Sequence, residues 1–138
     1  IANNWKALVG KNDIIFNLGD VSFANKEITS KFIQDMPGQK HLILGNHDRA
    51  RSVSWWRDVG FDFVYPYPII YEGFYILSHE SVYINSSMPY VNIHGHSHRE
   101  KTDNPRKLNI SVENFNYSPV IFEWVKEYFL KLGEKENE

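Results

Sequence analysis

The segment HLILGNHD, residues 41–48, places a short apolar run directly before a glycine and three polar residues. An apolar run of this length, bounded by turn residues, is typical of a buried strand. A similar run, IIFNLGD at residues 14–20, precedes it in the chain. Each run is followed by apolar residues at helical spacing, which end at Pro37-Gly38 after the first run and at Gly60 after the second. Two successive strand–turn–helix units predict an α/β fold.

The flanking segments extend this pattern. Residues 1–9 have the spacing of a helix that ends at Gly10, and Ser22 is placed to cap the next helix, whose apolar positions are Ile28, Phe32, Ile33 and Met36. After residues 65–68, short strands are expected at 69–71, 74–77, 91–93 and 108–112, followed by a helix at about 119–132. The expected sheet is partly parallel and partly antiparallel, or there are two stacked sheets with helices outside.

Composition limits the possible chemistry. The chain has 138 residues, a net charge of -2, no cysteine and six histidines. We expect a single domain over residues 1–132 and a polar tail over 133–138. Without cysteine, a metal site must use nitrogen and oxygen donors, and a reducing compartment such as the cytoplasm is expected. The charge balance does not favour binding to nucleic acid, no segment is long and apolar enough for a membrane, and the oligomeric state is left open.

Polar residues end four of the apolar runs. The runs stop at Asp20, at Asn46-His47, at His79 and at the group His94, His96 and His98. In α/β sheets, ligands bind beyond the carboxyl ends of the strands, where loops distant in sequence meet. Each residue taken singly also fits an ordinary turn or a hydrogen-bonded histidine. The occurrence of all four at strand ends favours one shared site.

The donor set of this site suits a transition metal. One carboxylate, one amide and several imidazoles favour Mn, Fe, Zn or Ni over Ca, which prefers six to eight oxygen ligands. A single Zn ion is one possibility. A pair of ions would need a bridging carboxylate, for which Asp20 is the natural candidate.

The four motifs Gly19-Asp20, Gly45–Asp48, His79 and Gly95–His98 together resemble the calcineurin-like metallophosphoesterases. The resemblance implies an α/β/β/α sandwich of two stacked mixed sheets flanked by helices, lacking its first strand. It also implies two divalent metal ions, most readily Mn. Asp20 would bridge both ions, Asn46, His79 and His96 would complete the second site, and His98 would bind the first.

The same resemblance assigns the catalytic residues. His47 would protonate or stabilise the leaving group, and Asp48 would orient the site. His94 is an extra imidazole that we expect to be structural or to support the ligands. Arg49, Arg51 and Arg99 lie close to the motifs in sequence and are candidates for binding phosphate oxygens.

One family motif is absent, since no Asp-x-His occurs in the chain. We therefore expect about 30 to 40 residues, one strand and one connection, to be missing upstream of Ile1. The fragment would then bind one metal well and hydrolyse esters poorly.

The implied activity is hydrolysis of a phosphodiester or phosphomonoester through in-line attack by a metal-bridging hydroxide on a small phosphorylated substrate. The alternative is a non-catalytic metal-binding scaffold, or a protein-interaction module, on the same fold.

Overall fold

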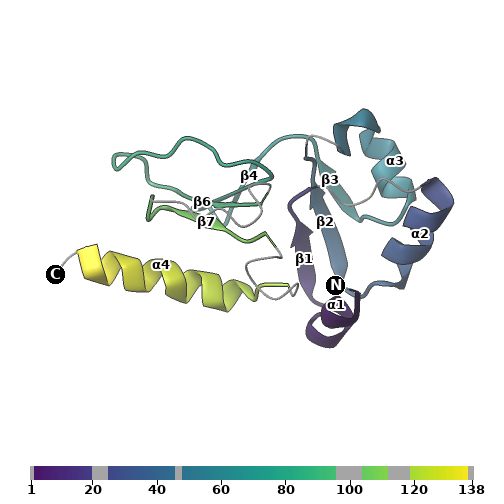
Figure 1. The fold of residues 1–138 in the computed structure, drawn as a ribbon, viewed down its shortest axis with the longest axis horizontal. Helices are drawn as coiled ribbons and strands as arrows, with labels where there is room; N and C mark the ends of the chain where they lie inside the picture. Colours follow the sequence, from purple (N-terminus) through teal and green to yellow (C-terminus); the bar gives the residue numbers. More distant parts are fainter. Residues whose placement is uncertain (1, 20–24, 46–47, 96–103, 112–118, 137–138) are drawn as a thin grey trace.

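The computed structural model describes residues 2–19, 25–45, 48–95, 104–111 and 119–136. Its elements, shown in Figure 1, are α1 (Ala2–Leu8), β1 (Ile14–Asn17), α2 (Lys26–Asp35), β2 (Gln39–Ile43), the 3-10 helix η1 (Asp48–Ala50), α3 (Val53–Asp58), β3 (Phe63–Tyr65), β4 (Ile69–Tyr71), β5 (Tyr75–Ser78), β6 (Val91–His94), β7 (Lys107–Asn109) and α4 (Phe122–Glu136). Within these ranges, no helix combines the length and the apolar character needed to span a bilayer.

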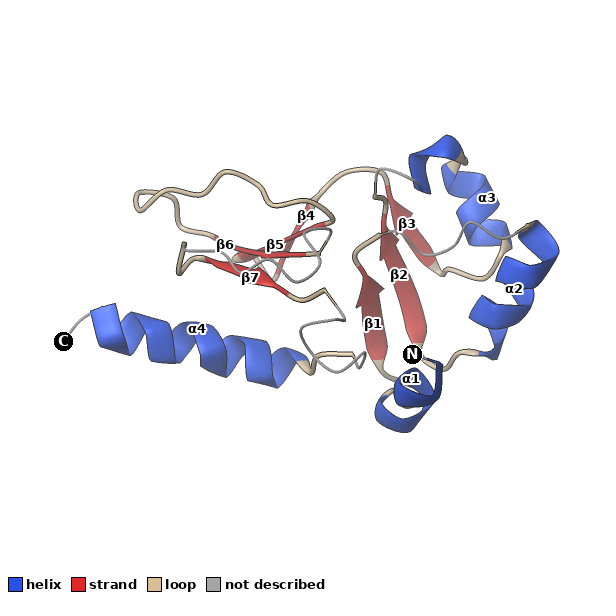
Figure 2. Ribbon diagram, in the orientation of Figure 1, coloured by secondary structure: helices blue, strands red, loops and turns tan. Residues whose placement is uncertain are grey.

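The strands form two sheets. The first sheet has the order β1-β2-β3 and is parallel throughout its described strands. The second has the order β4-β5-β6-β7, in which β4 and β5 are antiparallel and the other pairs are parallel. The predicted class, an α/β fold with two sheets flanked by helices, is confirmed (Figure 2). Strand β3 was not predicted.

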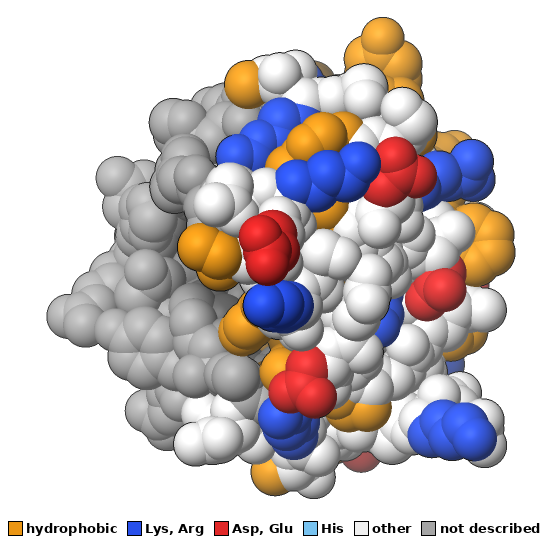
Figure 3. Space-filling view, turned by 90° about the vertical axis from the view of Figure 1, so that its right-hand side faces the viewer, with side chains coloured by type: hydrophobic (Ala, Val, Ile, Leu, Met, Phe, Trp, Pro, Cys, Tyr) orange, Lys and Arg blue, Asp and Glu red, His pale blue; other side chains and the backbone are white. Residues whose placement is uncertain are grey.

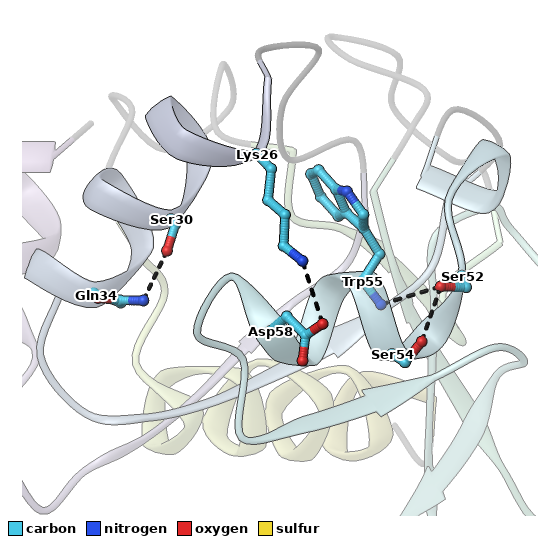
Figure 4. Close-up of polar contacts among 7 residues, drawn as sticks. All are labelled: Lys26, Ser30, Gln34, Ser52, Ser54, Trp55 and Asp58. Carbon is cyan, nitrogen blue, oxygen red and sulfur yellow. Dashed lines mark hydrogen bonds and ion pairs between the residues drawn. The ribbon is translucent and has the colours of Figure 1, made fainter.

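Helices α2 and α3 cover one face of the first sheet (Figure 2). The core beneath them is apolar, and Ile33, Leu42, Trp56 and Val59 in it are fully buried. Burying a side chain of this size contributes about 1.5–3 kcal/mol. Lys26 on α2 also forms an ion pair with Asp58 on α3 at 3.3 Å (Figure 4). The side of the molecule shown in Figure 3 carries interspersed acidic and basic side chains.

The start of α2 differs from the prediction. Its cap is Asn25, whose side chain accepts a hydrogen bond from the Ile28 nitrogen at 3.0 Å, so the predicted cap at Ser22 was wrong. The buried residues of the helix are Thr29 and Ile33, whereas Ile28 is 59% exposed. Of the four apolar positions predicted for this helix, Ile33 and Met36 are buried, whereas Ile28 and Phe32 are exposed. Helix α3 lies where a helix ending at Gly60 is predicted, and its cap Ser52 accepts from the Trp55 nitrogen at 3.1 Å (Figure 4).

A second core joins the two sheets and α4. It contains the buried residues Leu18, Ile43, Leu77, Ile93, Leu108 and Val125. The ring of Tyr71 contacts Phe16 of β1 at 5.0 Å between centroids and Phe122 of α4 at 5.4 Å. The first sheet and α4 therefore pack on the same face of the second sheet. Helix α4 continues to Glu136, through four of the six residues predicted as a polar tail.

The opposite face of the second sheet is covered by residues 79–90, a connection without a described helix or strand. The buried residues on this face are polar, namely Ser78, Asn92, His94 and Asn109, whereas Ile70 on the same face is exposed. Arg106 donates to the carbonyls of Met88 and Tyr90 at 2.8 and 3.0 Å. Lys107 donates to the Ser81 hydroxyl at 2.9 Å. This polar face supports the segment that follows His79.

Candidate metal centre at the strand ends

The His79 imidazole lies where β5 ends, and only 5% of the residue is exposed. Its Nδ1 lies 2.6 Å from the Leu18 carbonyl oxygen, just after β1. Because a carbonyl can only accept, Nδ1 must hold the proton, and in the neutral ring the lone pair is then on Nε2. Metal-binding histidines commonly have this arrangement, in which one ring nitrogen donates to a carbonyl and the other binds the metal. His79 therefore fits the predicted role of a metal ligand.

Two glycines lie against the His79 ring. A Cβ atom on Gly45 would be 2.8 Å from the ring atoms Cγ and Cδ2, which is too close for any side chain. A Cβ atom on Gly19 would be 2.5 Å from Nδ1, and the φ angle of this residue is +102°. Both positions therefore require glycine.

Gly95 directly follows β6 and connects the end of that strand to His79. Its nitrogen donates to the His79 carbonyl at 3.0 Å. Three glycines, each directly before a predicted ligand in sequence, thus lie next to His79, two against its ring and one at its main-chain carbonyl. The convergence of strand ends expected from the sequence is present in the described residues.

Most of the predicted site lies outside the described residues. The residues concerned are Asp20, Asn46, His47, His96, His98 and Arg99. Among the residues that are described, no group of three or more histidines and carboxylates could hold a metal ion. The ligand set therefore stays a prediction, supported by the fit of His79.

Asp48 closes the turn that contains the predicted catalytic histidine. It is 2% exposed, and its Oδ2 accepts a hydrogen bond from the Gly45 nitrogen at 2.8 Å. Its carbonyl oxygen accepts from Trp56 Nε1 at 2.9 Å. Asp48 thus bonds through its side chain to Gly45 and through its main chain to the buried Trp56. The orienting role expected for it stays a prediction.

The two arginine candidates that the structure describes, Arg49 and Arg51, have different surroundings. Arg49 lines a recess of about 190 Å³ together with His79, Glu80 and Ser81, and its Nη2 donates to the Pro66 carbonyl at 3.3 Å. The Arg51 guanidinium lies over the Trp55 ring, with Cζ 4.0 Å from the centroid. Of these two, Arg49 is the one that shares a recess with His79.

His94 is buried, with 2% of its surface exposed. Its Nδ1 lies 3.0 Å from the Gly95 carbonyl, and its Nε2 has no hydrogen-bond partner in the described structure. Burial lowers the pKa of this imidazole below its ordinary value, although the Gly95 carbonyl acts in the opposite direction. A neutral ring is therefore favoured at this position.

The sequence interpretation overlooked the groups that hold His79. The Leu18 carbonyl and the Gly95 nitrogen are main-chain atoms, so no residue type indicates them. One side-chain signal was available, namely Asn92 in the middle of the apolar run at 90–93. A polar residue at that place is unusual unless it has buried partners.

A family model described as calcineurin-like phosphoesterase matches residues 2–138. The chain belongs to the calcineurin-like phosphoesterase family. Members of this family are phosphoester hydrolases that use divalent metals. The predicted family is therefore confirmed.

Individual relatives add little about function. An uncharacterized protein of Methanocaldococcus jannaschii, MJ1445, is 28% identical over 98% of this chain and 74% of its own length. Gene 66 protein of Mycobacterium phage L5 is 43% identical over 35% of this chain, and that of phage D29 is 38% identical over 38%. These matches span about a quarter of each phage protein, 25% and 28% respectively.

A solved structure resembles the phosphoesterase fold described above. The protein of unknown function AQ665 from Aquifex aeolicus aligns with a TM-score of 0.67 over 91% of this chain and 81% of its own. The sequence identity is 21%, so this similarity concerns the fold alone.

Proposed function

We propose that the strand ends around His79 form a two-metal centre that hydrolyses phosphate esters. The observation that supports this most strongly is the convergence of Leu18, Gly45 and Gly95 on one residue, His79, whose Nδ1 is a donor. The proposed ligands are Asp20, Asn46, His79, His96 and His98. The metals would be two divalent ions, with Mn preferred among Mn, Fe, Zn and Ni.

When bound, such ions lower the pKa of a water molecule and neutralise phosphoryl oxygens, as in-line attack on phosphorus requires. Proton donation, orientation of the site and substrate binding are assigned to residues of the chain. His47 donates a proton to the departing alkoxide, and Asp48 holds the turn in which His47 lies. Arg49 lines the same recess as His79, which supports a role in binding a phosphoryl oxygen of a small phosphorylated substrate.

Metal binding by His79 provides the first test. In the full 138-residue chain, His79→Gln should lower Mn²⁺ affinity about 10- to 100-fold, measured by calorimetric titration. His41→Gln is the matched control because His41 is also buried but bonds to Tyr65 and Gln39. Equal Mn²⁺ affinity in the parent and His79→Gln would contradict the proposed site.

Turnover of bis(p-nitrophenyl) phosphate and p-nitrophenyl phosphate with Mn²⁺ tests the chemistry. His47→Ala should abolish hydrolysis while bound Mn²⁺ is retained. Unchanged turnover in that variant would remove His47 from the mechanism. A parent chain that binds Mn²⁺ but hydrolyses neither ester would favour the alternative, a metal-binding scaffold.

A further inference from the structure

Asn92 is a fully buried amide in the middle of β6, with 0% of its surface exposed. Its chain neighbours Val91 and Ile93 are buried apolar residues. Burying an amide without partners costs free energy, so its hydrogen bonds should account for its presence.

The amide bonds to the chain on both sides of His79. Its Nδ2 donates to the Ile76 carbonyl of β5 and to the Ser78 hydroxyl, each at 2.9 Å. Its Oδ1 accepts from the Val82 nitrogen at 3.0 Å. One side chain therefore holds the strand before His79 and the segment after it.

Ser78 extends this arrangement across His79. Its hydroxyl accepts from Asn92 and donates to the Glu80 carbonyl at 2.6 Å. The main-chain groups on either side of His79 are thus fixed relative to β6.

Lys107, which is partly exposed, bonds to the Ser81 hydroxyl, and two further polar residues bond farther along the connection. Asn104 donates to the Ile84 carbonyl at 3.1 Å, and Arg106 bonds to the carbonyls of Met88 and Tyr90. Asn92 and Ser78 together bond to residues on both sides of the histidine. A purely structural support would not need its bonds to be arranged around that residue.

We propose that Asn92 is a positioning residue for the His79 imidazole. By fixing Ile76, Ser78 and Val82, its amide sets the backbone so that Nδ1–H of His79 meets the Leu18 carbonyl. The Nε2 lone pair then has one fixed direction. The effect on metal binding rests on the proposed function, whereas the effect on the ring tautomer does not.

The test compares Asn92→Leu with the parent chain, using two measurements. Long-range proton–nitrogen NMR of the His79 ring, assigned with His79→Gln, should show a single Nδ1–H tautomer in the parent. In Asn92→Leu, we expect both tautomers, together with a fall of about 10- to 100-fold in Mn²⁺ affinity. Ser78→Ala should change both quantities in the same direction by less.

Lys40→Met is the control for general destabilisation. Lys40 is also buried, and its Nζ donates to the carbonyls of Ile33 and Met36 at 3.0 Å, away from the strand ends. This variant should unfold at a lower temperature but keep the His79 tautomer and the Mn²⁺ affinity of the parent.

An unchanged tautomer in folded Asn92→Leu would overturn the proposal. If that variant does not fold, an unchanged tautomer in Ser78→Ala would overturn it equally. A parent chain that shows the Nδ1–H tautomer but binds no Mn²⁺ through His79 would contradict the proposed function, and the NMR comparison would still decide the role of Asn92.

Discussion

The outer faces of the two sheets are covered in different ways. On the first sheet, α2 and α3 lie over apolar strand residues such as Leu42 and Val64, and α3 itself contributes Trp56 to the same core. On the second, the segment 79–90 lies over Ser78, Asn92 and His94. Both sets of residues are buried to a similar degree, yet one is apolar and the other is polar.

The difference follows from the backbone that covers each face. A helix bonds its own N–H and C=O groups internally, so it can rest on an apolar surface. A connection without regular structure has backbone groups that need partners once they are buried. The second face supplies these partners from side chains, and the same side chains fix the residues that follow β5.

The largest predicted effect concerns the helix-covered face. Trp56→Ala should lower the free energy of unfolding by about 3–5 kcal/mol, because the ring is 0% exposed and its removal leaves a cavity. Urea unfolding followed by far-UV circular dichroism measures this loss.

Trp124→Ala is the control for the tryptophan change, since Trp124 is 44% exposed on α4. We expect Trp124→Ala to lower the free energy of unfolding clearly less than Trp56→Ala does. If the two variants lost the same stability, the helix-covered face would not depend on close packing.

An intermediate effect is expected on the loop-covered face. Arg106→Met removes the donors for the Met88 and Tyr90 carbonyls, which should cost about 1–3 kcal/mol. Because these bonds hold only the connection, hydrogen exchange should accelerate at residues 84–91 more than in β2. Lys107→Met, which loses one exposed bond to Ser81, should have a smaller effect. Uniform acceleration throughout the chain would contradict a local role for Arg106.

The smallest effect concerns His41, on the first-sheet face that points toward the second sheet. Its ring stacks on Phe63 at 4.6 Å, and burial lowers its pKa below the ordinary 6.5, with Asp62 acting in the opposite direction. The unfolded chain therefore binds the proton more readily. The stability contributed by the neutral ring is complete above pH 6.5 and is lost as the pH falls from there toward the lower folded-state pKa.

Thermal unfolding at about pH 7.5 and about pH 5.5 tests this sign. His41→Gln should show a smaller drop in melting temperature between these values than the parent. A residual drop should persist because burial also lowers the pKa of His94. An identical drop in both proteins would exclude His41 as a contributor.

The helices and strands with clear apolar spacing were predictable from sequence. The helix predicted before Gly60 is present as α3. Its apolar positions Trp56 and Val59 are both core residues, and Gly60 follows its end. Strand β3 was missed because three residues before Pro66 resemble a connection. Its parallel pairing with β2 depends on residues more than 20 positions away. The choice of Asn25 rather than Ser22 as the cap of α2 could likewise not be read from the local sequence.

The sequence was sufficient to predict which strand ends lie together at the site. Motif order placed Gly19, Gly45, His79 and Gly95 at one location, which the described residues confirm. The hydrogen bonds that orient His79 were not predictable, because they involve main-chain atoms brought together by the docking of two sheets.

The bond between His79 and Leu18 also has a consequence for folding kinetics. These residues are 61 positions apart, so their contact closes a long loop and carries the entropic cost of doing so. A contact of such sequence separation forms late, after local helices and hairpins. We therefore expect metal affinity to appear only with the final docking step, so that time-resolved binding of Mn²⁺ would report completion of folding.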